Sequence, residues 1–98
     1  EKSLCIVLCS QGYPEKFINN VRLDNLNKLQ LNYNDFIFHA GTKKEKDEIF
    51  SNGGRVLNFV SLSNSFKSSR ERAIKLINQL NWKNGFFRKD IGFKIIDK

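Results

Sequence analysis

Residues 49–64 read IFSNGGRVLNFVSLSN, and this stretch decides the fold. Its second half, from Arg55 onward, is rich in β-branched and apolar residues and is typical of a strand. Two adjacent glycines, Gly53 and Gly54, interrupt the pattern directly before the arginine. Glycine weakens a strand interior unless the backbone must bend or a neighbour must come close. We therefore predict a strand that is kinked at the two glycines, with Arg55 beside the bend.

A second strand is predicted at residues 35–42, DFIFHAGT. Its side chains alternate between two faces that both carry apolar groups, with Phe36 and Phe38 on one of them. Strands of this kind are usually covered on both sides, and we expect the same here. Residues 43–48, KKEKDE, are charged and are predicted to form the turn of a hairpin whose second arm holds the glycine kink.

Residues 65–81 change to a helical period, because their apolar residues fall near the i, i+3, i+4, i+7 spacing of an amphipathic helix. Either Asn64 or Ser65 is expected to cap the start of this helix. Residues 17–33 remain open between a strand followed by a short helical turn and one poor helix. With an opening strand, SLCIVLC, and a last strand after a turn near residue 84, the pattern predicts an α+β domain with a largely antiparallel sheet.

Cys5 and Cys9 are the only cysteines, and both lie in the opening strand. Residues four apart in a strand are ~13 Å apart, whereas a disulfide needs Cα atoms within ~7 Å, so the two cannot pair with each other. With a single histidine in the chain they also make a poor zinc site. We expect two small buried thiols in a reducing, cytoplasmic protein.

The 98 residues are 40% hydrophobic, which predicts one globular domain spanning residues 1–98. The longest apolar run, LCIVLC, is too short to span a membrane. The net charge of +7 suggests a polyanion partner, but no block of five like charges occurs, so we favour a dispersed surface charge. The chain starts at Glu1 without methionine or leader, and we expect a domain of a longer protein.

The sequence contains no complete catalytic arrangement. Neither a G-x-x-x-x-G-K-[ST] loop nor a G-x-G-x-x-G loop is present to cradle phosphates. The single histidine, His39, lies among phenylalanines, and a packed structural role is favoured over a catalytic one. We therefore predict no catalytic residue and no metal ligand in this chain.

Four segments occur in an order and at spacings that resemble the C-terminal domain of the phosphoribosylamine–glycine ligase (glycinamide ribonucleotide synthetase) family. They are CIVLCSQGYP, DFIFHAGT, NGGRVLNFVSLSNSFKSSRERA and GFFRKDIGF. The resemblance runs from about Leu4 to Ile95 and is weakest at residues 15–33. It implies a small, mostly antiparallel, barrel-sandwich-like domain of an ATP-grasp enzyme.

The resemblance also implies a function. The family makes glycinamide ribonucleotide for purine biosynthesis: ATP activates glycine as an acyl phosphate, and the amine of 5-phosphoribosylamine attacks it. ATP and Mg²⁺ (or Mn²⁺) are held by an ATP-grasp region outside this domain, which closes the substrate side of the cleft. The expected partners are therefore the ATP-grasp and N-terminal domains of the same enzyme, and the isolated chain is expected to be inactive.

Related ATP-grasp enzymes supply an arginine to the sugar 5′-phosphate from a place that Gly53, Gly54 and Arg55 match. Glycines let backbone N–H groups approach an anion, and the guanidinium is a planar fork suited to phosphate oxygens. The resemblance therefore makes these three residues candidates for substrate binding. The alternative is that the glycines form only a bulge and that Arg55 pairs with a carboxylate.

His39, Thr42 and Lys43 are further candidates for lining the same cleft, because they lie in or directly after the matching FHAGT segment. Arg88 and Asp90, two residues apart, are expected to form a structural ion pair or to contact the missing region. Two other functions stay open. One is a small basic nucleic-acid-binding module, although the phenylalanines of DFIFHAGT lack basic partners. The other is the equivalent domain of a different ATP-grasp enzyme, such as a carboxylase.

Overall fold

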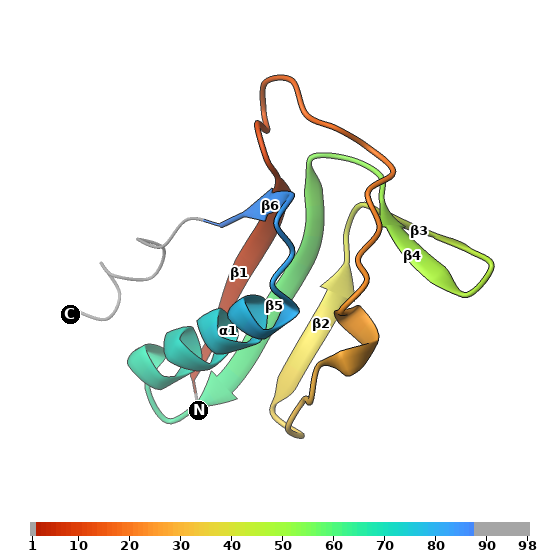
Figure 1. The fold of residues 1–98 in the computed structure, drawn as a ribbon. Helices are drawn as coiled ribbons and strands as arrows, with labels where there is room; N and C mark the ends of the chain where they lie inside the picture. The colour runs from red at the N-terminus through yellow and green to blue at the C-terminus, as the bar shows by residue number, and fades with distance from the viewer. Residues whose placement is uncertain (1, 88–98) are drawn as a thin grey trace.

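The structure is a computed structural model that describes residues 2–87. Figure 1 shows one helix lying across a four-stranded sheet, with a separate two-stranded hairpin at one side. The elements are β1 (Lys2–Ser10), the 3₁₀ helix η1 (Leu26–Lys28), β2 (Asp35–His39), β3 (Thr42–Glu45), β4 (Glu48–Ser51), β5 (Arg55–Ser63), α1 (Phe66–Leu80) and β6 (Gly85–Phe86).

The main sheet has the strand order β2-β5-β1-β6, and all of its neighbours are antiparallel. The predicted α+β class is therefore confirmed, although the described part of the sheet has two free edges and is not a closed barrel. The last predicted strand is present as β6, and the pair Arg88 and Asp90 lies outside the described residues.

The predicted antiparallel pairing exists, because β2 pairs with the middle of β5, from Asp35 opposite Ser61 to His39 opposite Leu57. The prediction of one strand kinked at the glycines is wrong, because Gly53 and Gly54 separate β4 from β5, and these two strands belong to different sheets. The prediction that residues 43–48 form a simple turn is wrong. They belong to a second hairpin, β3–β4, which reverses at Lys46 and Asp47, with φ angles of 49° and 67°. Two successive positive φ angles match the twist of a tight two-residue turn. Residues 17–33 contain an isolated bridge at Arg22 followed by η1, closer to the first alternative than to one helix.

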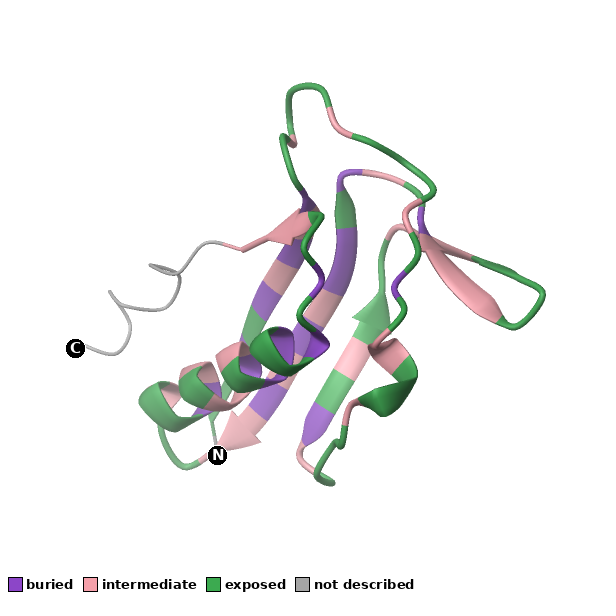
Figure 2. Ribbon diagram, in the orientation of Figure 1, coloured by how far each residue is buried: buried purple, intermediate pink, exposed green. Residues whose placement is uncertain are grey.

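The core lies between α1 and one face of the sheet. Ser65 caps the helix, because its side-chain oxygen accepts a hydrogen bond from the Ser68 N–H at 3.1 Å. The helix ends at Asn81, which adopts a left-handed conformation. Figure 2 shows buried residues alternating with more exposed ones along the strands. The side chains that fill the core from the sheet and the helix are Leu4, Ile6, Leu8, Leu57, Phe59, Ala73, Leu76, Ile77 and Leu80.

The other face of the sheet has no covering layer among the described residues. Phe36 and Phe38 are 41% and 55% exposed, so the prediction that their strand is covered on both sides is wrong. The prediction of two buried thiols is wrong as well, since Cys5 is exposed and Cys9 is half-buried. The physical reason is that the single helix covers only one face. We call the other face the open face, and its side chains are Ser3, Cys5, Val7, Cys9, Phe36, Phe38, Asn58, Val60, Leu62 and Phe86.

One buried ion pair ties β2, β5 and α1 together. The Asp35 carboxylate accepts a hydrogen bond from Ser61 Oγ at 2.6 Å and one from Arg72 Nε at 2.8 Å. The Asn32 N–H donates a third, at 3.0 Å. Burial alone raises the pKa of Asp35, but these hydrogen bonds and the charge of Arg72 outweigh it and hold the pKa below its ordinary value.

The lowered pKa of Asp35 predicts a loss of stability in acid. A carboxyl group with a depressed folded-state pKa stabilises the fold above its unfolded-state pKa of about 3.9. That contribution is lost as the pH falls through the folded-state value. We expect urea midpoints of the wild-type chain to fall below about pH 4 more steeply than those of Asp35→Asn, whose side chain carries no titrating group at this position. Parallel midpoint curves for the two proteins would contradict the lowered pKa.

Candidate functional site

The two glycines of the opening stretch lie where β1 ends and β5 begins. The Ser10 N–H donates to the Gly54 carbonyl at 2.7 Å, and Ser10 Oγ donates to the Gly53 carbonyl at 2.9 Å. Gly53 has a φ of 135°, which side chains strongly disfavour. Its N–H donates to Asn19 Oδ1 at 2.8 Å and is therefore not free to bind an anion. The glycine turn is held by side chains from distant parts of the chain.

Tyr13 explains why Gly54 carries no side chain. A Cβ atom added at Gly54 would lie 1.7 Å from Cδ1 of Tyr13, so the aromatic ring occupies the space of the missing side chain. Tyr13 also contacts Phe17, with ring centroids 5.9 Å apart. Tyr13 therefore packs within the turn, between Phe17 and the glycines.

We expect Gly54→Ala to lower the free energy of unfolding by about 1–3 kcal/mol, because the Tyr13 ring must be displaced. In a Tyr13→Ala background the same substitution should cost much less, since the obstructing ring is gone. Urea unfolding of the four proteins of this double-mutant cycle measures the coupling. Strictly additive costs would show that the ring does not oppose a side chain at this position.

A β-bulge decides which way Arg55 points. Leu8 lies opposite Leu57, but Cys9 lies opposite Arg55, so Val56 is an extra residue in β5. Because side chains alternate along a strand, the extra residue moves Arg55 from the helix-covered face to the face of Cys9. The bulge thus brings the guanidinium to the end of the open face.

The Arg55 side chain has no hydrogen-bond or ion-pair partner among residues 2–87, and the residue is exposed. Its charge acts on the neighbouring thiol: burial raises the pKa of Cys9, and Arg55 opposes that rise. The alternative in which Arg55 pairs with a carboxylate is therefore not observed in the described part of the chain. An exposed guanidinium without a partner is free to bind an external anion.

The FHAGT loop lies directly against the glycine turn. A Cβ atom added at Gly41 would lie 2.4 Å from the carbonyl oxygen of Arg55, so the two backbones are in contact. His39 Nδ1 and Thr42 Oγ1 are hydrogen-bonded at 2.8 Å. The prediction that His39 is a packed structural residue is wrong, because its side chain is exposed at the end of an edge strand. Lys43 lies on the hairpin, with its ammonium 3.6 Å from the Glu45 carboxylate.

The sequence-based candidates are thus partly brought together. The structure joins Gly53, Gly54 and Arg55 to the loop that carries His39 and Thr42, while Lys43 is engaged on its own hairpin. Sequence reasoning did not identify the supporting residues Ser10, Asn19 and Gly41, because they come from segments 11–44 residues away along the chain. The one available signal was the glycine of FHAGT, which is needed where two backbones touch.

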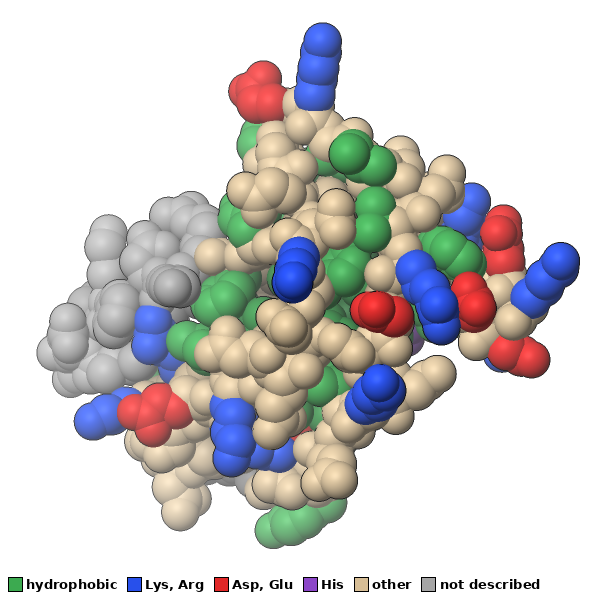
Figure 3. Space-filling model, in the orientation of Figure 1, with side chains coloured by type: hydrophobic (Ala, Val, Ile, Leu, Met, Phe, Trp, Pro, Cys, Tyr) green, Lys and Arg blue, Asp and Glu red, His purple; other side chains and the backbone are tan. Residues whose placement is uncertain are grey.

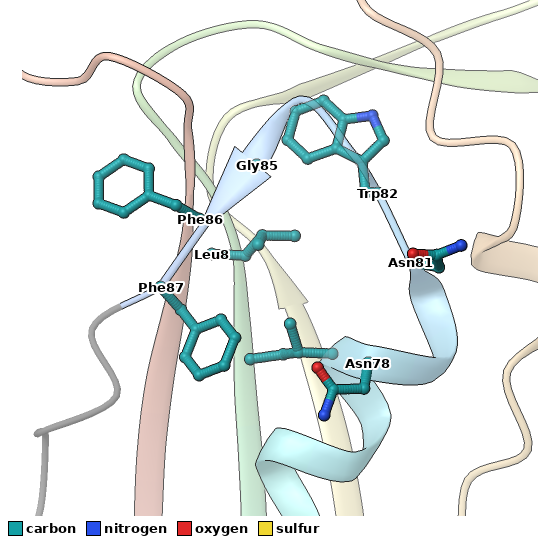
Figure 4. A pocket seen from close by; sticks show the side chains of 8 residues that line it. Leu8, Asn78, Asn81, Trp82, Gly85, Phe86 and Phe87 are labelled. Carbon is teal, nitrogen blue, oxygen red and sulfur yellow. The ribbon is translucent and has the colours of Figure 1, made fainter.

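Two hollows lie near the sheet. A cavity of about 320 Å³ lies between the end of α1 and β6. Figure 4 shows Leu8 and Phe86 on its strand side and Asn78, Asn81 and Trp82 at the end of α1 and just after it. This cavity shares no lining residue with the Arg55 site. The second hollow, of about 390 Å³, lies on the open face around Cys9 and is almost entirely apolar. Its described lining residues are Ile6, Val7, Cys9, Tyr13, Pro14, Phe86 and Phe87.

Residues 2–87 contain no group of three His, Cys, Asp or Glu side chains placed to hold a metal ion. Within the same range, no helix has both the length and the apolar character that crossing a membrane requires. Fold and site together define a small α+β domain with an exposed arginine at the end of the open face of its sheet.

Comparison with known proteins identifies the family. The chain belongs to the family described as phosphoribosylglycinamide synthetase, C domain, which matches residues 3–94. It is 39% identical over 93 residues to the phosphoribosylamine–glycine ligase of Fusobacterium nucleatum and 33% identical over 96 residues to that of Haemophilus influenzae. These alignments cover 94% and 98% of this chain but only 22% of each relative. The resemblance stated from the sequence is confirmed.

The fold is also shared with a solved structure. The crystal structure of phosphoribosylamine–glycine ligase from Thermotoga maritima matches 90% of this chain with a TM-score of 0.72 and 24% sequence identity. The match covers 21% of that protein. This chain therefore corresponds to about one fifth of the length of the ligases that it resembles.

Proposed function

We propose that this chain is the C-terminal domain of an ATP-dependent ligase that joins glycine to 5-phosphoribosylamine to give glycinamide ribonucleotide in the cytoplasm. The observation that carries the proposal is the family match over residues 3–94. The relatives named above are ligases of this kind, and their alignments cover 94% and 98% of this chain. The domain's partners are then the rest of the enzyme and its small-molecule substrates.

In this proposal the domain binds and orients substrate and does not itself carry out the chemistry. Arg55 donates hydrogen bonds to the 5′-phosphate of phosphoribosylamine, and its exposed guanidinium, which has no partner within residues 2–87, supports that role. Thr42 and His39 lie on the adjoining loop and can line the same cleft. ATP, held with Mg²⁺ or Mn²⁺ mainly by polypeptide outside this chain, supplies the phosphoryl group that activates the glycine carboxylate.

The nucleic-acid alternative has weaker support. Figure 3 shows lysine and arginine side chains scattered over the helix side of the molecule instead of gathered in one stripe. On the other side, Phe36 and Phe38 are stacked with centroids 6.3 Å apart and resemble a base-stacking platform. However, within residues 2–87 the side chains of the open face include no lysine, and the arginine next to them is Arg55 at the end of the sheet. The open face therefore offers few positive charges to bind the phosphate backbone of a nucleic acid.

A chimaeric enzyme tests the proposed function. These 98 residues replace the matching C domain of the F. nucleatum ligase, and glycinamide ribonucleotide formation is assayed. We expect activity within about tenfold of the parent enzyme, while the isolated chain and the truncated parent ligase each give none. A folded chimaera that binds ATP but makes no product would contradict the proposal. Turnover by the isolated chain would contradict the proposal that ATP binding and catalysis need the rest of the ligase.

A further inference from the structure

The glycine turn is held by side chains as well as by the neighbouring strands. The Gly53 N–H donates to Asn19 Oδ1 at 2.8 Å, and the Gly53 carbonyl accepts a hydrogen bond from Ser10 Oγ at 2.9 Å. Both polar groups of the Gly53 backbone are therefore bound by side chains from segments 34 and 43 residues away along the chain. Two adjacent glycines can adopt many more backbone conformations than other residues. These hydrogen bonds select one conformation from that large set.

Asn19 is itself held in place by the backbone that follows it. The Asn20 N–H donates to the Ser51 carbonyl at 2.8 Å, and the Ser51 N–H donates to the Val21 carbonyl at 2.9 Å. Ser51 Oγ also accepts a hydrogen bond from the Val21 N–H at 3.0 Å. Figure 1 shows this segment running beside the end of β4. Asn19 therefore reaches the glycine turn from a backbone that is anchored to the last residue of β4.

Arg55 begins β5 directly after the turn, so the backbone conformation at Gly53 and Gly54 sets the direction of its side chain. Phosphate recognition by a guanidinium depends on direction, because the planar fork forms paired hydrogen bonds only in a narrow range of orientations. A turn that becomes ordered only when the substrate binds also lowers the affinity. Without its restraints, the glycine turn would weaken phosphate binding even though Arg55 is present.

Fold stability alone is a weak explanation for the Asn19 contact. Asn19 is exposed, and so is its hydrogen bond to Gly53. Water can replace an exposed acceptor, so such a bond contributes little to the stability of the folded state. Ser10, in contrast, is only 1% exposed, and removal of its hydroxyl would disturb buried backbone. Asn19 is therefore the residue at which the turn can be released with little effect on the fold.

We propose that Asn19 is a positioning residue of the phosphate-binding site. Its side-chain oxygen holds the Gly53 amide and thereby sets the direction in which Arg55 meets the phosphate of the substrate. This inference rests on the proposed function. It goes further by assigning a role in substrate recognition to a residue that acts through Arg55 and not through its own contact with the substrate.

The substrate preference of the chimaeric ligase tests the proposal. The ratio kcat/KM is measured for phosphoribosylamine and for ribosylamine, which lacks the phosphate. Asn19→Ala should lower the preference for the phosphorylated amine by about 3–10-fold, the factor that corresponds to one hydrogen bond of ordinary strength. The Michaelis constant for phosphoribosylamine should rise, while kcat and the Michaelis constant for ATP stay within about twofold of the parent. A purely structural role would affect both amines equally.

A double-mutant cycle shows whether Asn19 acts through Arg55. In an Arg55→Ala background, Asn19→Ala should lower the preference no further, because the group that it positions is gone. The matched control is Asn25→Ala, which removes another asparagine hydrogen bond to a distant backbone group, from Nδ2 to the Leu80 carbonyl at 2.9 Å. The control should leave the preference unchanged. Additive losses in the cycle, or equal losses from Asn19→Ala and Asn25→Ala, would overturn the proposal.

The isolated chain separates failure of this inference from failure of the proposed function. If the chimaera makes no product, the proposed function fails, and NMR spectroscopy of the isolated chain decides the role of Asn19. Asn19→Ala should speed hydrogen exchange at the Gly53 amide by about 3–10-fold and increase the motion of the Arg55 amide, whereas Asn25→Ala should change neither. Unchanged exchange and motion in Asn19→Ala would overturn the positioning role. An active chimaera whose Asn19→Ala variant keeps its full preference for phosphoribosylamine would overturn this inference and leave the proposed function standing.

Discussion

Asp35→Ala is expected to lower the free energy of unfolding by about 3 kcal/mol, a large part of the 5–15 kcal/mol typical of a whole domain. The Asp35 side chain is only 2% exposed and holds Ser61, Asn32 and Arg72. Its removal leaves the buried Ser61 hydroxyl and the Arg72 guanidinium without their shared acceptor. Because the Arg72 side chain is 24% exposed and can turn toward water, the expected cost lies at the lower end of the range for buried pairs.

A second ion pair in the same chain provides the control. Arg22 and Glu48 approach to 3.5 Å, but their side chains are 57% and 44% exposed. Exposed pairs contribute about 0–1 kcal/mol, so Glu48→Ala should change stability by no more than that. Chemical denaturation measures the free energy of unfolding of both variants. Equal losses for Asp35→Ala and Glu48→Ala would show that the contact between β2, β5 and α1 is not a main source of stability.

Arg55→Ala in the chimaeric ligase is expected to raise the Michaelis constant for phosphoribosylamine by about 10–100-fold. A charge-assisted hydrogen bond contributes about 1.5–3 kcal/mol, and each 1.4 kcal/mol corresponds to a factor of ten in affinity. Stability should change little, because the guanidinium has no hydrogen-bond or ion-pair partner within residues 2–87. Arg55→Lys should recover part of the affinity, since lysine keeps the charge but lacks the planar fork.

The matched control for this experiment is Arg22→Ala. It removes another exposed positive charge, the guanidinium that lies 3.5 Å from the Glu48 carboxylate. We expect its Michaelis constants to stay within about twofold of the parent, because long-range effects of exposed charges are screened by salt. A similar loss in both arginine variants would mean that overall positive charge, and not a contact from Arg55, governs substrate affinity.

The elements that have their own local signal were predictable from the sequence. The helix of residues 65–81 has a clear apolar period and a serine cap, and the structure places it at Phe66–Leu80. The strand after Gly54 and its antiparallel pairing with residues 35–39 were also predicted correctly. The β3–β4 hairpin was missed because Lys46 and Asp47 lack the Asn-Gly or Asp-Gly signal of a tight turn.

Features that depend on distant parts of the chain were not predictable. Alternating apolar residues in DFIFHAGT suggested cover on both sides, but periodicity does not reveal whether the second layer belongs to the same chain. At the site, the sequence pointed to Gly53, Gly54 and Arg55. It did not reveal that Ser10 and Asn19 hold the turn or that a bulge at Val56 reverses the direction of Arg55. Those contacts depend on strand register, which local patterns do not specify.

The central claim is that Arg55 contacts the 5′-phosphate of the substrate, and substrate discrimination tests it most directly. In the chimaeric ligase, kcat/KM is measured for phosphoribosylamine and for ribosylamine, which lacks the phosphate. If Arg55 binds the phosphate, Arg55→Ala should reduce the preference for the phosphorylated amine by about 10–100-fold and leave the rate with ribosylamine nearly unchanged. An unchanged preference, with both substrates slowed equally or not at all, would contradict the claim.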